Sequence, residues 1–376
     1  MNQSADYRSL GRIDWRIVPV VLSLMVISLL VISSMTSDAD NLFWTPLVKS
    51  QLRWFLCGWA VFAVTAIFDY RKLQSLSWLL YFIVIVLLLG LYLTTPIQNV
   101  HRWYRIPVIG LNIQPSEHAK LILAIALAHF LSKQGNQIGS LRVGCQAFAI
   151  MGVPFLLILK QPDLGTALIL FPIALGMCYF AGIHKGLIRV LTIGAIGGLV
   201  VVLFLFVGLF SHEEMRPFFT RYMKEYQYER LNPNTYHQKA AATSIAVGGL
   251  TGTGWRAGEF AKKKWLPAAH TDSVFAAYGE EFGFVGLVIM LLLFFALIYF
   301  SLQVAVVAKD AFGRILAAGL AIYLAMHVLF NISMMCALLP IAGVPLIFVT
   351  YGGNSVLTTM AALGILQSIY SKRFMF

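Results

Sequence analysis

The stretch IVPVVLSLMVISLLVISS, residues 17–34, contains no charged side chain and decides the fold class of the chain. An α-helix needs about 20 mainly apolar residues to cross the hydrocarbon core of a bilayer. Arg8, Arg12 and Arg16 precede the run, so a secretory signal peptide is the competing interpretation. The run is long for the apolar part of a signal peptide, and no clear cleavage site of small residues follows it. We therefore predict a first membrane-spanning helix here.

Similar apolar runs recur along the whole chain, separated by short polar breaks. Hydrophobic residues make up 59% of the 376 residues and charged residues only 12%, whereas a soluble globular chain carries about a quarter charged residues. We therefore predict an all-α polytopic integral membrane protein, in which residues 1–376 form one domain with about ten spanning helices. These helices are expected near residues 17–35, 50–68, 76–94, 115–132, 143–159, 165–183, 189–210, 282–307, 315–335 and 353–370.

The cysteines give no sign of a metal site or a disulfide framework. Their positions are scattered, and no CxxC or Cys/His spacing occurs. We expect them to be small buried hydrophobic residues. They are Cys57, Cys145, Cys178 and Cys336.

The distribution of Lys and Arg orients the predicted helices. Most basic residues of the short breaks fall on one side of the membrane, and the positive-inside rule makes that side cytoplasmic. Both termini are therefore predicted to lie in the cytoplasm. These basic residues are Arg8, Arg12, Arg16, Arg71, Lys72, Lys133, Arg142, Lys185, Arg189, Lys309, Arg314, Lys372 and Arg373.

Residues 211–281 form a long polar stretch that we predict outside the cytoplasm, between the seventh and eighth helices. One interpretation is a solvated loop that touches anionic headgroups. The other is a site for an anionic ligand, for which lipid-linked phosphate is a better candidate than nucleic acid. The basic residues of this loop are Arg216, Arg221, Lys224, Arg230, Lys239, Arg256, Lys262, Lys263 and Lys264.

Two ionisable residues fall at the start of the fourth predicted helix. Glu117 and Lys120 are three residues apart, which places them on one helix face and close enough to pair. Charged residues at membrane depth are unfavourable unless they pair or serve a function. A structural ion pair and a pair that lines a polar cavity are both compatible with this spacing.

Arg102 and Asp163 each admit a structural and a functional interpretation. Arg102 is predicted at the outer interface, where a guanidinium can bind phosphate through two parallel hydrogen bonds or anchor the chain beside Trp103. Asp163 lies just before an apolar run and is a preferred residue type at a helix N-cap. The spacing favours the cap.

His270-Thr271-Asp272-Ser273 closes the basic loop. From spacing alone, Asp272 is narrowly favoured as another N-cap. As a general base it would have to be ionised, which an ordinary Asp pKa of about 3.9 allows at neutral pH. Glu280 and Glu281 follow, and they could bind a cation, pair with loop arginines or cap the eighth helix.

Two further segments carry many glycines or prolines. Residues 248–254, GGLTGTG, follow no predicted strand and lack the lysine of a nucleotide-binding loop, so we expect tight turns rather than a phosphate cradle. Residues 340–355 contain Pro340, Gly343 and Pro345 and cannot form one clean helix. Backbone of this kind at membrane depth must line a cavity or pack on protein.

In this order, the motifs resemble the SEDS family of shape, elongation, division and sporulation proteins over nearly the whole chain. Each motif is weak alone, but the ordered set is specific. The short tails are more similar to the elongation member RodA than to the division member FtsW. The resemblance is carried by Arg102-Trp103, Gln114-Pro115-Ser116-Glu117 with Lys120, Gln161-Pro162-Asp163-Leu164-Gly165-Thr166, Tyr236-His237-Gln238, the glycine-rich run ending at Trp255, His270-Thr271-Asp272, Gly279-Glu280-Glu281-Phe282-Gly283 and Pro340 to Ser355.

The resemblance implies a peptidoglycan glycosyltransferase of the bacterial cytoplasmic membrane that polymerises lipid II at the outer face during elongation. It also implies that Asp272 is the essential acidic residue, which replaces the N-cap interpretation. Other residues expected to contact substrate are Glu117, Asp163, His270, Glu280 and Ser355. The cations expected to stabilise the leaving diphosphate are Arg102, Lys120, Arg216, Arg221 and Arg230.

A divalent cation, Mg²⁺ or Mn²⁺, held by Asp272 or Glu280 is an alternative way to stabilise the diphosphate. No metal or other cofactor is assigned from the sequence. The expected partners are lipid II, the nascent glycan strand, membrane lipids and a class B penicillin-binding protein with transpeptidase activity. Nucleic acid is not expected.

Three alternatives stay open at this point. A lipid II flippase would use the buried charges and the broken segment, a scaffold would only recruit a transpeptidase, and a division-type paralogue similar to FtsW would act in septation. The predicted charges and motifs cluster in the outer half of the membrane, which favours chemistry at the outer face over transport.

Overall fold

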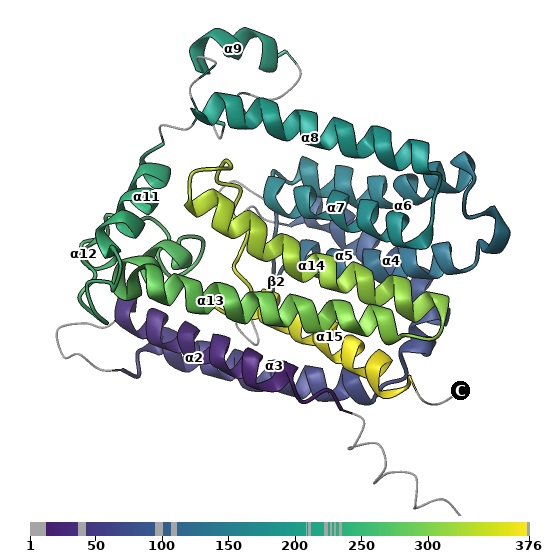
Figure 1. Cartoon of the computed structure of the whole chain (residues 1–376), viewed down its shortest axis with the longest axis horizontal. Coiled ribbons are helices and arrows are strands. Elements are labelled where there is room, and N and C mark those ends of the chain that lie inside the picture. The colour runs from purple at the N-terminus through teal and green to yellow at the C-terminus, as the bar shows by residue number, and fades with distance from the viewer. Residues whose placement is uncertain are drawn as a thin grey trace, which may run out of the picture.

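The computed structural model describes residues 13–36, 43–94, 101–106, 111–207, 209, 212–221, 225, 228, 231–232 and 235–373. Its helices form an elongated bundle, with the short helices α11 (Tyr236–Gly248) and α12 (Glu259–Lys262) grouped at one end (Figure 1). We call this the site end; α2 ends and α13 begins there. The C-terminus lies at the opposite end. Four residues of the sequence predictions, Arg8, Arg12, Lys224 and Arg230, lie outside the described residues.

Each of the ten predicted helices corresponds to a helix of the structure. Within the described residues, eight helices are long and apolar enough to cross a membrane, which confirms the fold class; ten spans stay a prediction. The eight are α2 (Ile17–Thr36), α3 (Pro46–Ile67), α4 (Tyr70–Gly90, continued by η1, Leu91–Leu93), α6 (Leu141–Lys160), α7 (Leu164–Ala181), α8 (Lys185–Val207), α13 (Val274–Val307) and α14 (Ala311–Met335).

The other two predicted spans, α5 (Pro115–Ser132) and α15 (Gly353–Ser371), are helical but more polar. Helix α5 contacts α4, α6, α7, α14 and α15, and most of its residues are buried. Polar side chains on a helix enclosed by protein can find partners there, whereas on a lipid-facing helix they would be unsatisfied. The enclosure of α5 by five other helices therefore accommodates its buried polar side chains, among them Glu117, Lys120 and His129.

The predicted eighth helix begins earlier than the sequence indicates. Helix α13 starts at Val274 and contains a break at Gly283, where φ is 62° and ψ is −166°. The glycine-rich turn supplies hydrogen-bond partners at this break: Phe284 N donates to Gly249 O at 2.9 Å and Thr253 N to Glu280 O at 2.9 Å. A Cβ at Gly252 would lie 2.1 Å from Glu281 O, so this approach requires glycine. The turn therefore has the structural role that we predicted.

The polar stretch 211–281 is thus partly helical rather than a simple loop. Besides the first two turns of α13, it contains α9 (His212–Phe219), α11 and α12. Two short strands, β1 (Tyr104–Ile106) and β2 (Leu111–Ile113), pair antiparallel before α5 and were not predicted. They belong to the site end, because the β2 residue Asn112 accepts a hydrogen bond from Asn354 at the start of α15.

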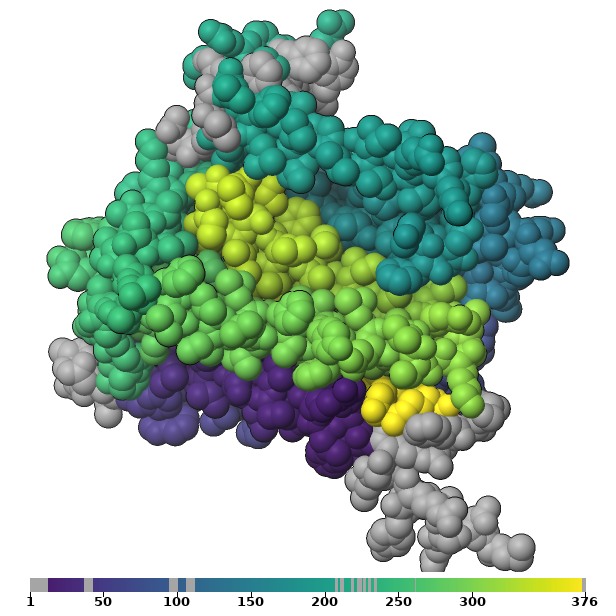
Figure 2. Space-filling model, in the orientation of Figure 1, coloured from purple at the N-terminus to yellow at the C-terminus, as the bar shows by residue number. Residues whose placement is uncertain are grey.

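Much of the bundle surface is apolar and exposed. Helix α8 is exposed along nearly its whole length and packs mainly on α7, leaving a hollow between it and α14 in the space-filling view (Figure 2). The prediction of buried cysteines is wrong for three of the four: only Cys178 is buried. A small apolar side chain can face lipid as readily as protein, so composition alone did not separate the two cases.

Candidate active site

Asp272 lies in the turn that leads into α13, and it is partly exposed. The N-cap residue of α13 is Ser273, not Asp272, so the cap interpretation of Asp272 is wrong. A Cβ built on Gly343 would lie 3.5 Å from Asp272 Oδ2, which shows that the carboxylate faces the segment between α14 and α15. Gly343 has φ of 71°, a conformation that glycine adopts without strain.

Asn331 fixes the backbone of Asp272. Its Nδ2 atom donates to Asp272 O at 3.1 Å and to Val344 O at 2.8 Å. One amide group on α14 therefore joins the turn that carries the carboxylate to the broken segment opposite it. Asn331 itself is fully buried, and its hydrogen bond to Val344 O is buried as well.

Two neighbouring carbonyls of the same turn are held in the same way. Tyr351 N donates to His270 O at 3.0 Å, and Thr350 Oγ1 donates to Thr271 O at 3.1 Å. Gln51 of α3 donates in turn to Thr350 O at 3.4 Å. The segment between α14 and α15 has no regular helix, as predicted, and it packs on the Asp272 turn.

His237 on α11 also contacts the turn that carries Asp272. Its Nε2 atom lies 2.6 Å from Ser273 Oγ, which donates its only proton to Pro267 O at 2.8 Å. His237 Nε2–H must therefore donate to Ser273. Burial lowers the pKa of His237, while the charge of Asp272 raises it. The imidazole thus lies near the carboxylate and tends to stay neutral.

Glu117 and Lys120 form the predicted ion pair, with Lys120 Nζ 2.7 Å from Glu117 Oε1 and both side chains almost fully buried. Nζ also lies 2.8 Å from His327 Nε2, and His327 Nδ1 lies 3.1 Å from Pro345 O. The ion pair is thus connected to the same broken segment. Its burial favours the structural interpretation, and substrate contact by either residue stays a prediction.

Arg102 and Asp163 both stabilise the corner between α6 and α7. Asp163 is the N-cap of α7, as predicted, and accepts hydrogen bonds from Ser116 Oγ at 3.0 Å and Gln114 Nε2 at 3.1 Å. Arg102 donates to the carbonyls of Gln161, at 3.1 Å, and Pro162. Neither arrangement includes a phosphate-binding geometry, so their contact with substrate stays a prediction.

The structure does not bring Arg216 or Arg221 to Asp272. Arg216 pairs with Glu225 and Glu213, and its helix α9 lies beyond α8, away from the start of α13 (Figure 1). Arg221 is exposed in the turn after α9. The expectation that these two arginines stabilise the diphosphate at Asp272 therefore finds no support in this arrangement.

Glu280 is occupied by structural hydrogen bonds. Its Oε1 accepts from Glu259 N at 2.6 Å and Phe260 N at 3.0 Å, and its Oε2 accepts from Ser244 Oγ at 3.2 Å. These bonds fasten α12 and α11 to α13. A metal ion held by Glu280 would have to displace them, and no group of three His, Cys, Asp or Glu side chains suited to a metal ion occurs in the described ranges. Glu280 therefore does not fit the metal alternative, whereas a cation held by Asp272 stays a prediction.

The last two predicted contact residues are His270, in the turn that carries Asp272, and Ser355. The His270 ring is 6.3 Å from the Tyr351 ring, measured between centroids. Ser355 is buried near the start of α15, and its Oγ has no hydrogen-bond partner among the residues that the structure describes. Both remain candidates for substrate contact.

A bundle with eight apolar helices and a carboxylate held at a helix–loop junction defines a polytopic membrane protein with an acidic site at one end. The chain belongs to the FtsW, RodA and SpoVE family of cell cycle proteins, whose profile matches residues 14–374. This confirms the resemblance to the SEDS family.

Curated relatives and solved structures agree with this assignment. The chain is 30% identical to peptidoglycan glycosyltransferase MrdB of Escherichia coli K12, over 96% of this chain and 95% of the relative. It is 31% identical to a probable peptidoglycan glycosyltransferase FtsW of Trichlorobacter lovleyi, over 86% and 83%.

Among structures, a chain from a peptidoglycan synthase complex that coordinates polymerization and crosslinking matches with a TM-score of 0.77 and 25% identity, over 97% of this chain and 99% of that one. The rod shape determining protein RodA of Thermus thermophilus matches with a TM-score of 0.69 and 24% identity, over 96% and 98%. At 24% identity, the likeness to RodA of Thermus thermophilus shows a shared fold and nothing further.

Proposed function

We propose that this protein is a peptidoglycan glycosyltransferase that polymerises lipid II into glycan strands, acts in elongation, and uses Asp272 as its general base. The observation that carries the proposal is the fixation of the turn around Asp272: Asn331, Thr350 and Tyr351 bond three successive carbonyls of the turn, and His237 of α11 bonds Ser273. A base must be held in place to contribute fully to a reaction. The relatives named peptidoglycan glycosyltransferase support the reaction class.

In the proposed reaction, the 4-hydroxyl of a lipid II acceptor attacks the anomeric carbon at the lipid-linked end of the growing strand. The new glycosidic C–O bond forms as the bond to undecaprenyl diphosphate breaks, and the configuration inverts. Asp272 takes the hydroxyl proton, and such assistance is typically worth about 10²–10⁴ in rate. The donor is already activated by its diphosphate, so no nucleotide is needed.

We place the site end at the outer face of the cytoplasmic membrane and both termini in the cytoplasm, because the short basic breaks lie at the opposite end. At that opposite end, Lys372 lies 3.4 Å from Asp69. A class B penicillin-binding protein is the proposed partner, supported by the likeness to a chain of a peptidoglycan synthase complex.

Polymerisation by the purified protein tests this proposal against a flippase. In detergent there is no membrane to cross, so a flippase alone would leave lipid II unchanged. We expect glycan strands on gel analysis when the protein is incubated with lipid II without a partner. Unchanged lipid II, with a polymerase control active in the same detergent, would contradict the proposal.

Asn331→Leu tests whether the fixation of the Asp272 turn matters for turnover. The substitution keeps the number and branching of the side-chain heavy atoms but removes the donor to the buried Val344 carbonyl and the partly buried Asp272 carbonyl, a change of about 1–3 kcal/mol. We expect kcat for lipid II to fall about tenfold or more with KM nearly unchanged, because Asn331 contacts backbone rather than substrate.

Ser301→Ala is the matched control for that experiment. Ser301 is also a buried polar residue, but it bonds only the Leu297 carbonyl of its own helix, α13, far from the turn. We expect wild-type kcat from this variant. Equal kcat values in Asn331→Leu and wild type would remove the positioning role of Asn331.

A further inference from the structure

Two basic residues at the site end have no role in the proposed reaction. Lys49 and Arg53 lie one turn apart in the first part of α3, and both are exposed. Within the part of the chain that the structure describes, neither forms an ion pair. Under the orientation proposed above, they are cations on the outer side of a span, where the positive-inside bias does not account for them.

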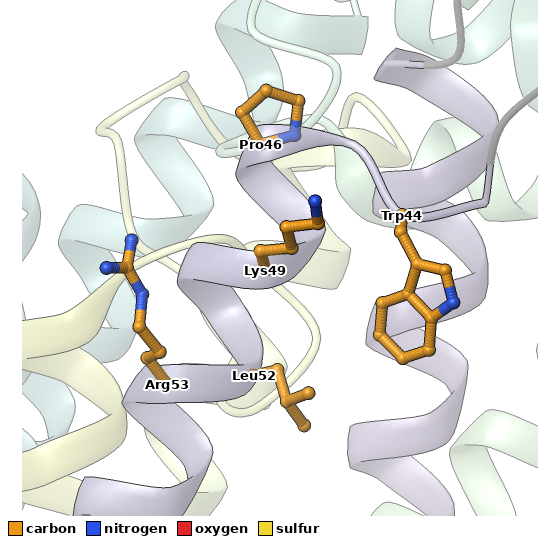
Figure 3. A pocket seen from close by; sticks show the side chains of 5 residues that line it. All are labelled: Trp44, Pro46, Lys49, Leu52 and Arg53. Carbon is orange, nitrogen blue, oxygen red and sulfur yellow. The ribbon is translucent and has the colours of Figure 1, made fainter.

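These two side chains line an open pocket of about 570 Å³ together with Trp44, Pro46 and Leu52 (Figure 3). The Lys49 amine points toward Pro46 at the start of α3, and the Arg53 guanidinium extends away from the helix axis. Leu52 and the exposed ring of Trp44 supply the apolar part of the lining. The pocket therefore combines cations with an apolar, aromatic surface.

The pocket lies on the side of α3 that faces away from the catalytic turn. Gln51 is buried and bonds Thr350 O and Gly352 N, so its side of α3 faces the segment before α15. At 100° per residue, Lys49 and Arg53 each point about 160° away from Gln51. The pocket consequently opens toward the surrounding lipid rather than toward Asp272.

The depth of the two cations matches the headgroup layer. Arg53 lies about 10 Å along α3 from the helix start at Pro46, and a long basic side chain at this depth can extend toward the interface. Tryptophan is enriched at the same level of membrane proteins. A phosphate between two basic residues one turn apart would be contacted by both.

From this arrangement we infer that the Trp44–Arg53 pocket binds the phosphate of an anionic phospholipid of the outer leaflet. Lys49 and Arg53 contact the phosphate, and Trp44 and Leu52 pack against the glycerol and the first part of the acyl chains. The bound lipid thereby stabilises α3, whose opposite side is hydrogen-bonded to Thr350 and Gly352 through Gln51. The inference rests on the proposed orientation, but it requires no turnover.

Short-chain phosphatidylglycerol is a suitable probe, added to the full-length protein in a neutral detergent. Binding is measured as the part of the change in tryptophan fluorescence that is lost in the Trp44→Phe variant. We expect saturable binding of phosphatidylglycerol, much weaker binding of phosphatidylcholine, and weaker phosphatidylglycerol binding at higher ionic strength. Lys49→Gln with Arg53→Gln should raise Kd roughly thirtyfold.

A matched control removes the same two charges elsewhere. Lys185 and Arg189 on α8 have the same residue types and the same spacing, are exposed, and lie outside the pocket. Lys185→Gln with Arg189→Gln should leave Kd at the Trp44 pocket unchanged. An equal loss of binding in both double variants, or equal Kd values for the two phospholipids, would overturn the inference.

Lipid II separates the phospholipid from the substrate as the occupant. If lipid II displaced phosphatidylglycerol, and Lys49→Gln with Arg53→Gln raised KM for lipid II, the pocket would belong to the substrate diphosphate and the inference would be wrong. Because the binding signal is measured without turnover, absence of polymerisation in every variant would count against the proposed function alone. If the Lys49→Gln, Arg53→Gln variant does not fold, the weakening of phosphatidylglycerol binding by salt in the wild-type protein provides the test.

Discussion

Lys120→Met is expected to destabilise the protein by about 3–5 kcal/mol, because it leaves the buried Glu117 carboxylate without its cation. Lys120 Nζ lies 2.7 Å from Glu117 Oε1, and the two side chains are 0% and 4% exposed. Glu117 Oε2 has no hydrogen-bond partner among the described residues, so no second donor would compensate. Thermal unfolding of the purified variant in detergent measures the change.

The double variant Glu117→Leu with Lys120→Met provides the control. Removing both charges leaves no unpaired ion in the core, and replacing a buried pair by apolar residues is often neutral. We expect the double variant to unfold at a higher temperature than Lys120→Met alone. A single variant as stable as wild type would show that the pair does not hold the bundle together.

The Glu117–Lys120 ion pair is also connected to the candidate active site. His327 joins Lys120 to Pro345 O, and Asn331, one turn further along α14, joins Val344 O to Asp272 O. The buried ion pair is therefore connected, through His327, to the segment that faces the Asp272 carboxylate. The flippase interpretation would need these charges to line a polar path, and their near-complete burial does not favour it.

Local patterns predicted those parts of the structure that depend on near neighbours in sequence. The apolar runs predicted the helices, the spacing of Glu117 and Lys120 predicted their pairing, and the position of Asp163 predicted a cap. Pro340, Gly343 and Pro345 predicted that residues 340–355 do not form one helix. In each case the decisive contact lies within one or two helical turns, so composition and spacing contain the information.

The contacts that position Asp272 could not be predicted in this way. Asn331 and its acceptor Asp272 are 59 residues apart in sequence, and His327 and Lys120 are 207 apart. A signal was nevertheless present: His327 and Asn331 stand four residues apart in an apolar helix, where polar side chains usually have a partner or a function. The spacing of these residues does not identify their partners. Spacing alone also predicted Asp272 as the N-cap residue of α13, a position that Ser273 occupies.

Replacing Asp272 by asparagine is expected to reduce lipid II polymerisation by about 10²–10⁴-fold. Asparagine keeps the size of the side chain and the backbone bonds of the turn, but its amide cannot accept the hydroxyl proton. Folding should be unaffected, since the turn is held through backbone carbonyls that Asn331, Thr350 and Tyr351 contact. Asp14→Asn is the control, because Asp14 is a buried carboxylate that pairs with Arg16 just before α2, at the opposite end of that helix from the site.

The most direct test is the initial rate of glycan-strand formation from lipid II by purified wild-type, Asp272→Asn and Asp14→Asn proteins with equal unfolding temperatures. The account predicts strands from wild type and Asp14→Asn, and a rate at least about 10²-fold lower from Asp272→Asn. A wild-type rate from folded Asp272→Asn would contradict the assignment of Asp272 as the base.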